Sequence, residues 1–407
     1  MKILFLTQWF QPEPFFKGLP FAKALAAKGH TVEVLTGFPN YPSGKVYPGY
    51  RLRLFKRETM DGIRVNRLGL YPSHDKLTSR RIFNYLSFAL IALVLGPWVI
   101  RRPDVVYVYN LITLGPSAFL FRLLFRSKVV IDVQDLWPES VKNSGMMKSK
   151  QALRLLNGIC NRVYRDADRL VVLSPGFKKI LIDRGVSPER IAVVYNWCDE
   201  IGLRRVEDSD LSDRYGLKGK FNVLFAGSMG IAQSLENVLD CAALCQNHLS
   251  NVQFVFVGDG VNRAKLEKIA DEKKLENVKF LPPQPIEAMG EIYAFANATL
   301  VHLKDDPLFE ITIPSKTQAC LYIGKPIIMA IRGDAADLVR RAASGVMCEP
   351  ESPHDLMRAV KVLYDMPEEE RINMGKAGHH FYIKHLSFSQ GVKELERNFI
   401  SVLQVIN

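Results

Sequence analysis

The sequence predicts an α/β protein made of two Rossmann-like, doubly wound domains that face a central cleft. The chain has 407 residues, of which 48% are hydrophobic and 24% charged, a composition that suits two globular domains of roughly 200 residues each. Short β-rich runs alternate with helical patterns, as is typical of parallel sheets. The alternation restarts at Phe221 after an irregular, charged segment at 199–220, so we place the domain boundary near residue 200.

Apolar runs along the chain are the expected strands of the two sheets. For the first domain, residues 1–200, they are Ile3–Leu6, Thr31–Leu35, Val105–Tyr109, Val129–Val133 and Leu170–Leu173. For the second domain, residues 201–384, they are Val223–Ala226, Val252–Val257, Val278–Leu281, Thr299–Leu303 and Pro326–Ile331. From Leu386 onward apolar residues recur at helical spacing, which predicts a helix over residues 385–407.

The apolar start of the chain is interpreted as a buried first strand and not as a secretion signal. Lys2–Phe10 is short, lacks a small-residue cleavage site and runs into Gln11-Pro12-Glu13-Pro14. The six cysteines include no Cys-x-x-Cys pair, and no histidine pattern accompanies them that would complete a zinc site. We therefore expect small buried thiols in a reducing compartment, a cytoplasmic protein and no bound metal.

Basic side chains are concentrated in the first domain. Residues 1–200 contain 30 Lys and Arg against 15 Asp and Glu, and residues 201–407 contain 24 against 27, so the net charge of +12 arises as +15 minus 3. A solvated basic face would explain a scattered excess, but crowding beside an apolar segment favours binding to an anionic surface. The crowded residues are Arg51, Arg53, Lys56, Arg57, Arg64, Arg67, Lys76, Arg80 and Arg81. No nucleic-acid-binding module is recognised, so nucleic acid is not an expected partner.

The neighbouring apolar segment, residues 82–100, contains no charged side chain and is bracketed by Arg80-Arg81 and Arg101-Arg102. Its length would allow it to span a bilayer. Asn84, Ser87 and Gly96-Pro97 interrupt it, however, and a core-type strand follows almost at once. We expect a helix that is buried in the fold or lies in the membrane interface, with its basic flanks at the lipid headgroups.

Three glycine-bearing turns follow predicted strands: Gln8–Gly18, Gly227-Ser228-Met229-Gly230 and Gly258-Asp259-Gly260. Glycines at strand ends allow backbone N–H groups to approach a phosphate, although a single glycine after a strand is more often just part of a tight turn. No Gly-x-Gly-x-x-Gly with a following acidic residue and no Walker loop is present. A nicotinamide dehydrogenase is therefore disfavoured.

The most specific segment runs from Phe309 to Ala319 and contains Glu310, Pro314-Ser315-Lys316 and Gln318. A carboxylate, a hydroxyl and an ammonium placed just before a helix are suited to holding a sugar, a ribose and a diphosphate, with the helix dipole assisting the anion. The alternative is an ordinary helix start with Ser315 as its N-cap.

Together these segments resemble the retaining glycosyltransferases of family 4. The resemblance covers essentially the whole chain and is carried by Gly37–Pro42, Asp132–Ser140, Gly227–Gly230, Gly258–Gly260 and Glu310–Pro326. It is greatest toward the bacterial amino-sugar transferases of O-antigen and capsule assembly, such as the N-acetyl-L-fucosamine transferases. It implies a GT-B fold, a metal-independent hexosyltransferase with a UDP-sugar donor and no separate cofactor, and a polyprenyl-diphosphate-linked glycan acceptor. It also implies that the terminal helix crosses back to the first domain, unless it caps its own.

Some positions depart from the pattern of that family. Of the usual pair of glutamates seven residues apart, Glu310 lies near the first place, while Ala319 occupies the second with Gln318 beside it. The Arg and Lys that usually neutralise the diphosphate correspond to Ser228 and Gln233, so Lys316 is the best local candidate for that charge.

The resemblance implies a set of site residues. Catalytic roles are expected for Asp135, Glu310 and Lys316, with Asp132 and Glu139 as competitors of Asp135 for the acceptor. Contacts to the nucleotide sugar are expected from Gly18, Gly227, Ser228, Gly230, Gln233, Gly258, Pro314, Ser315 and Gln318.

The expected location is the inner face of the cell membrane, as a peripheral protein on an anionic surface. Two other functions stay open: an epimerase of UDP-GlcNAc with the same overall shape, and a non-catalytic scaffold of an envelope-assembly complex. The basic and apolar stretch speaks against the epimerase, which needs no membrane acceptor. The missing second glutamate favours the scaffold.

Overall fold

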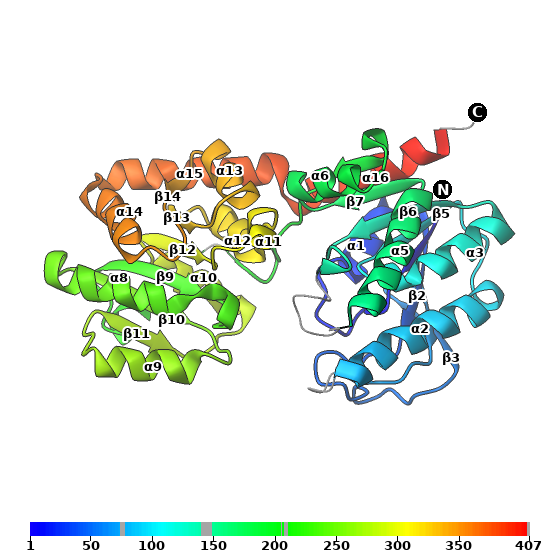
Figure 1. Ribbon diagram of the computed structural model, residues 1–407, viewed down its shortest axis with the longest axis horizontal. Coiled ribbons are helices and arrows are strands. Elements are labelled where there is room, and N and C mark those ends of the chain that lie inside the picture. The colour runs from blue at the N-terminus through cyan, green and yellow to red at the C-terminus, as the bar shows by residue number, and fades with distance from the viewer. Residues whose placement is uncertain (74–77, 140–148, 205, 207–210, 405–407) are drawn as a thin grey trace. The chain divides into compact units, whose positions relative to one another are not determined.

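The computed structural model describes residues 1–73, 78–139, 149–204, 206 and 211–404 and divides into two compact units (Figure 1). One unit contains Met1–Val194 and the residues from Val392 onward, and the other contains Tyr195–Gly391. Each has its own parallel sheet with flanking helices, so the prediction of two doubly wound α/β domains is confirmed. Lys76 of the basic stretch and Ser140 of the segment 132–140 lie outside the described residues.

The sheet of the first unit has eight strands in the order β3-β4-β2-β1-β5-β6-β7-β8. All neighbouring strands are parallel except β3 and β4. The strands are β1 (Lys2–Leu6), β2 (Thr31–Gly37), β3 (Phe55–Met60), β4 (Ile63–Leu68), β5 (Val105–Tyr109), β6 (Lys128–Val133), β7 (Arg169–Val172) and β8 (Ile191–Val193). The helices include α1 (Leu19–Ala27), α2 (Thr78–Val99), α3 (Gly115–Phe125), α5 (Lys150–Asp166), α6 (Pro175–Asp183) and the end of α16 (Phe388–Gln404).

The sheet of the second unit has six parallel strands in the order β11-β10-β9-β12-β13-β14. The strands are β9 (Phe221–Ala226), β10 (Val252–Val257), β11 (Val278–Leu281), β12 (Ala298–His302), β13 (Ile327–Ala330) and β14 (Gly345–Met347). The helices include α8 (Leu235–His248), α9 (Arg263–Glu272), α11 (Pro307–Glu310), α12 (Ser315–Ile323), α13 (Asp334–Arg341), α14 (Pro353–Asp365) and α15 (Glu368–His385). Alternate residues of β9, Phe221, Val223 and Phe225, share one core cluster with buried residues of α8 and α14.

Every run that was expected to be a strand forms one. Their near-continuous burial explains why they were recognisable, because strands of a covered parallel sheet are apolar on both faces. The strands that the sequence did not reveal are β3, β4, β8 and β14. Strands β3 and β4 are rich in charge, and their basic residues hid their β character.

The basic stretch is only partly a surface feature, which corrects the expectation drawn from it. Arg67 is fully buried in β4, where its Nε donates to Glu58 at 2.5 Å and its Nη1 donates to the Gly37 carbonyl at 3.1 Å. Arg64 pairs with Glu33 at 3.0 Å and Lys56 with Glu58 at 2.7 Å. Arg67 thus links β4 to β3 and Arg64 links β4 to β2, while Lys56 pairs within β3. All three basic side chains have carboxylate partners within the first unit and are not unpaired surface cations.

Candidate active site

The expected donor residues of the second unit lie at the carboxyl edge of its sheet. Loops after β9, β10, β12, β13 and β14 all emerge there, since the strands are parallel. In open α/β sheets this edge is where ligands bind.

Two glycine turns pack against one another at this edge. A Cβ placed on Gly258 would lie 2.1 Å from the Gly227 carbonyl oxygen, and one on Gly260 would lie 2.5 Å from that of Met229. Gly227 and Gly258 also have φ values of +137° and +138°, which side chains rarely adopt. The close approach of the two turns by itself requires a glycine at position 258. A nucleotide contact is therefore not needed to explain why this residue is glycine.

Most backbone N–H groups of the first glycine turn are already used inside the protein. The Gly227 amide donates to the Val257 carbonyl at 2.9 Å, and the Gly230 amide donates to Oε1 of Gln233 at 3.0 Å. Gly230 and Gln233 thus bond to each other through the Gly230 amide and the Gln233 side-chain oxygen, so the Gly230 N–H is engaged in the structure and the predicted phosphate contacts of both residues stay predictions. Among the described residues, the exposed Ser228 has no intramolecular acceptor for its amide, and of the predicted donors in this turn its N–H is the one available.

Lys316 places a buried, unpaired ammonium beside this turn. Within the described part of the chain its Nζ has no hydrogen-bond partner, and it lies 3.7 Å from the centre of the Phe225 ring. A Cβ on Gly227 would come within 3.6 Å of the same Nζ. Burial lowers the pKa of Lys316 to about 8. A buried cation without a counter-ion is costly to keep, and the contact that the structure gives this ammonium is the face of the Phe225 ring.

The start of α12 differs from the ordinary capped helix that was the alternative interpretation. Its N-cap is Pro314 with no side-chain cap, and Ser315 is the first helical residue with an exposed side chain. Gln318 is buried, and in the amide orientation that satisfies both of its polar atoms the nitrogen donates to the carbonyls of Pro314 at 2.7 Å and Ser315 at 3.1 Å. This amide fixes the turn before the helix, which leaves at most its oxygen for the predicted ribose contact.

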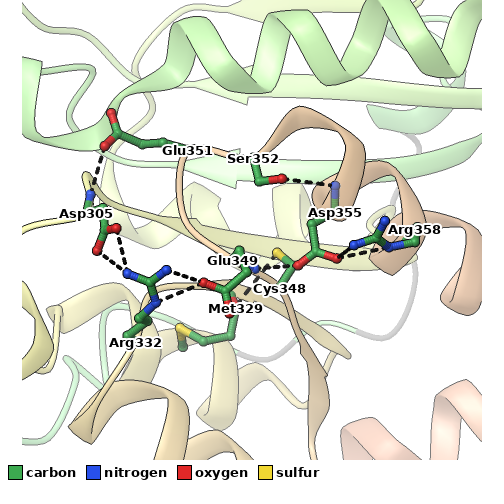
Figure 2. A network of polar contacts seen from close by, with 9 residues as sticks. All are labelled: Asp305, Met329, Arg332, Cys348, Glu349, Glu351, Ser352, Asp355 and Arg358. Carbon is green, nitrogen blue, oxygen red and sulfur yellow. Dashed lines mark hydrogen bonds and ion pairs between the residues drawn. The ribbon is translucent and has the colours of Figure 1, made fainter.

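Glu310 is exposed at the end of α11, and a polar network braces the loop that carries it. Figure 2 shows Arg332 between two carboxylates: its Nη1 donates to both oxygens of Asp305 at 2.6 Å and its Nε donates to Glu349 at 2.8 Å. Glu351 accepts from the Asp305 amide at 2.9 Å. Loops after β12, β13 and β14 are tied together in this way, next to the glycine turns.

In the first unit, Asp132 belongs to a fully buried ion pair. Its Oδ2 accepts from Lys17 Nζ at 2.6 Å and from the Tyr107 hydroxyl at 2.5 Å, and Gln134 donates to its other oxygen. Neither member of the ion pair is exposed to solvent. Burial and the neighbouring Asp132 charge raise the pKa of Tyr107 well above its ordinary value, so the phenol stays protonated and donates to the carboxylate. Asp132 holds the loop before α1 in place, and the structure does not offer it to an acceptor.

Three carboxylates, Asp132, Asp135 and Glu139, were candidates for contact with the acceptor, and Asp135 is the unpaired one. Glu139 pairs with Arg184, whereas Asp135 has an exposed side chain and no hydrogen-bond or ion-pair partner among the described residues. Desolvation by the surrounding protein raises its pKa above the ordinary value. Of the three, Asp135 alone is both unpaired and accessible.

Gly18 lies at the N-cap of α1 and is held by Gln11. The side-chain oxygen of Gln11 accepts from the Leu19 amide at 2.5 Å, and a Cβ on Gly18 would lie 2.1 Å from that oxygen. Gly18 is buried under this carboxamide, so the predicted contact with a diphosphate requires Gln11 to move.

Aromatic side chains that the sequence analysis missed gather near Asp135. Trp9 stacks on Phe15 with ring centres 5.1 Å apart, and Tyr41 and Tyr85 lie 5.9 and 5.8 Å from Trp9. Burial raises the pKa of Tyr85, and the Asp135 charge adds to that rise. Trp9, Phe15 and Tyr41 lie in the loops after β1 and β2, so the available signal was the recurrence of aromatics there, whereas Tyr85 comes from α2. Among the described residues there is no group of His, Cys, Asp and Glu suited to a metal ion.

Comparison with known proteins identifies the class to which this arrangement belongs. Residues 19–197 match the family described as "Glycosyl transferase 4-like domain", and residues 209–381 match "Glycosyl transferases group 1". The chain is therefore a two-domain glycosyltransferase of the GT-B class.

Relatives of known sequence and structure agree with this assignment. The chain is 26% identical over 362 residues to the putative colanic acid biosynthesis glycosyl transferase WcaI of Escherichia coli, covering 86% of this chain and 88% of the relative. It is 27% identical over 272 residues to the probable glycosyltransferase WbjE of Pseudomonas aeruginosa, covering 65% and 67%. HepE of Anabaena in complex with UDP and glucose has a TM-score of 0.68 at 18% identity, covering 98% and 100%. The structure described as "Trehalose-6-phosphate from E. coli bound with UDP-2-fluoro glucose" has a TM-score of 0.74 at 14% sequence identity, and the match covers 100% of both chains. At 18% and 14% identity, the two structural matches show the fold alone.

Proposed function

We propose that the protein transfers a glycosyl group, an N-acetylamino sugar, from a UDP-sugar to a lipid-linked glycan during assembly of a surface polysaccharide at the inner face of the cell membrane. Relatives named for colanic acid biosynthesis and as glycosyltransferases support the polysaccharide setting. UDP in the complexes of HepE supports a uridine nucleotide as the donor.

The observation that carries the proposal is the unpaired Lys316 ammonium beside the first glycine turn. The donor diphosphate would be held between Lys316, the Ser228 amide and the uncapped start of α12, and Glu310 would bind sugar hydroxyls. Charge grows on the leaving phosphate as the bond from the sugar C1 breaks, so a fixed cation lowers the barrier more than it tightens donor binding. Lys316 supplies this charge in place of a metal ion.

Asp135 orients the acceptor hydroxyl in this proposal. The acceptor oxygen bonds to C1 on the face that the diphosphate leaves, which retains the configuration, and the hydroxyl proton passes to the leaving phosphate. An unpaired, accessible carboxylate is suited to accept a hydrogen bond from that hydroxyl.

Calorimetric titration with UDP, UDP-GlcNAc, UDP-GalNAc, UDP-FucNAc, GDP-mannose and NAD tests the donor site. One UDP-sugar is expected to bind tightly with or without EDTA, Lys316→Ala is expected to abolish that binding, and Lys268→Ala, an exposed lysine of α9 in the same unit, is expected to leave it unchanged. Binding that survives Lys316→Ala would refute the site. Donor binding without transfer to any lipid-linked acceptor would favour a scaffold.

A further inference from the structure

Helix α2 of the first unit exposes a stripe of large apolar side chains. Five of them face solvent: Phe83 by 65%, Leu86 by 53%, Leu90 by 61%, Val94 by 58% and Trp98 by 86%. Their spacing of three or four residues places them on one face. Surface helices of globular proteins bury such a stripe, so this face requires an apolar surrounding.

The opposite face of α2, with Asn84, Phe88, Ala92 and Gly96 buried, packs on the protein. Asn84 is buried, where it accepts from Gln8 at 2.5 Å and donates to the Tyr71 carbonyl at 2.7 Å. Near the other end of the helix, a Cβ on Gly96 would lie 2.5 Å from the Phe121 ring of α3. Contacts at both ends hold α2 along its length against the unit, and Figure 1 shows it beside α3.

The exposed apolar surface continues beyond α2. Of the twenty large hydrophobic residues that are exposed in the described chain, ten belong to residues 52–124: Leu52, Leu54, Tyr71, Phe83, Leu86, Leu90, Val94, Trp98, Leu123 and Leu124. Tyr71 and Phe83 are in ring contact at 5.9 Å. A concentration of this kind marks an interaction surface.

Charge around the surface identifies the occupant. Residues 79–126 contain six arginines and one acidic residue, Asp104. Arg80 and Arg81 flank one end of the apolar face, and Arg101 and Arg102 flank the other. Basic residues at both ends of a bulky apolar stripe fit a membrane with anionic lipids.

We propose that α2 lies in the plane of an anionic membrane, with the face from Phe83 to Trp98 inserted among the lipids and the other face kept on the protein. Ser79–Val99 is long and apolar enough to cross a bilayer, and 22% of an 18-residue apolar stretch within it is buried in the protein. It does not cross, because a spanning helix would have to leave the contacts of Asn84 and Gly96 and place the two arginine pairs on opposite sides of the bilayer. This orientation specifies how the protein would contact the membrane, and its biological role rests on the proposed function.

Vesicle binding of the full chain without donor tests this orientation. Wild type is expected to bind vesicles that contain phosphatidylglycerol more tightly than pure phosphatidylcholine. The triple variant Phe83→Ser, Leu90→Ser, Trp98→Ser is expected to lose roughly 1000-fold in binding, about tenfold per side chain. The matched triple Val261→Ser, Val362→Ser, Ile372→Ser, from exposed positions of the second unit, is expected to bind as wild type does. Arg101→Gln with Arg102→Gln should cost about fivefold per arginine and only on the anionic vesicles.

A tryptophan at the middle of the helix separates the two orientations. In Leu90→Trp with Trp98→Phe, lipids brominated near the headgroup should quench the new tryptophan more than lipids brominated at the chain end. Stronger quenching from the chain end would show a spanning helix and overturn the proposal, as would equal binding by the two triple variants. Donor titration of the Phe83 triple variant is expected to match wild type, so loss of vesicle binding there cannot be confused with a failure of the donor site.

Discussion

At the scale of single residues, Lys316 should make the proposed donor site sensitive to pH. Its pKa of about 8 lies below the ordinary value of 10.5, so between these values the unfolded chain keeps a proton that the folded protein has released. Stability should therefore rise with pH across that window. Donor binding should do the opposite, because the diphosphate requires the protonated ammonium. We expect affinity for the UDP-sugar to fall by up to about tenfold per pH unit above about 8.

Calorimetry over this pH range, in buffers of different ionisation enthalpy, measures both the affinity and the proton taken up. Lys316→Arg provides the comparison, because a guanidinium stays protonated throughout and its affinity should not change near pH 8. Parallel pH profiles of the wild type and this variant would contradict the assignment.

Asp132 and Asp135, three positions apart, are expected to respond in opposite ways to the same substitution. Asp132→Asn removes the charge that compensates the buried Lys17 and should destabilise the first unit by about 3–5 kcal/mol. Asp135→Asn changes an exposed side chain and should leave stability within about 0.5 kcal/mol of wild type while lowering transfer. Denaturant unfolding and a transfer assay on both variants check this. Full transfer by Asp135→Asn would remove that residue from the mechanism.

The candidate residues of the two units were predictable to different degrees. The sequence placed Glu310 and Lys316 around the start of a helix, and the structure has Glu310 at the end of α11 and Lys316 in the first turn of α12. Their roles in binding stay predictions. Gly230, Gln233 and Gln318 each make a hydrogen bond within their own turn, which a resemblance of sequence does not reveal, and their predicted contacts with the nucleotide sugar stay predictions. Asp132 and Asp135 were indistinguishable in sequence because Lys17, the partner of Asp132, lies 115 residues away.

At the scale of elements, the contact between the two glycine turns makes a testable steric demand. Gly258→Ala would bring a methyl group against the Gly227 carbonyl at a φ of +138°, and the strain and displacement should cost about 2–4 kcal/mol. Gly219→Ala is the control, because Gly219 also has a positive φ, +72°, but no atom lies within 4 Å of its added Cβ. That variant should cost about 1 kcal/mol. Thermal unfolding without nucleotide measures both, and equal losses would show that φ alone explains the glycine.

Strands β3 and β4 show why some elements were missed. The alternation that identifies a strand requires polar residues to face water, yet Asn66 and Arg67 are consecutive and both fully buried. Asn66 donates to Glu33 at 2.8 Å and Arg67 to Glu58 at 2.5 Å. Buried polar pairs across strands break the alternation of polar and apolar residues. Only the three-dimensional structure reveals that these buried polar groups have hydrogen-bond partners.

At the scale of the whole molecule, the last helix completes the core of the first unit although it comes from the far end of the sequence. Val392, Leu395, Phe399 and Val402 of α16 are buried. Phe399 meets Tyr107 of β5 with ring centres 5.2 Å apart. Glu396 bonds His30 and Lys28 at 2.8 Å each. The residues from Val392 onward thus belong to the fold of the first unit.

Neighbouring positions of α16 allow this dependence to be measured without deleting the helix. Phe399→Ala should destabilise the first unit by about 3–5 kcal/mol, because it empties a fully buried site, whereas Ile400→Ala, at a position 38% exposed, should cost about 1 kcal/mol or less. Hydrogen exchange resolves the two units separately, and the loss of protection in Phe399→Ala should appear in β1 and β5 while β9 and β10 keep theirs. Equal loss in both sheets would show that the units unfold as one and that α16 is not specific to the first.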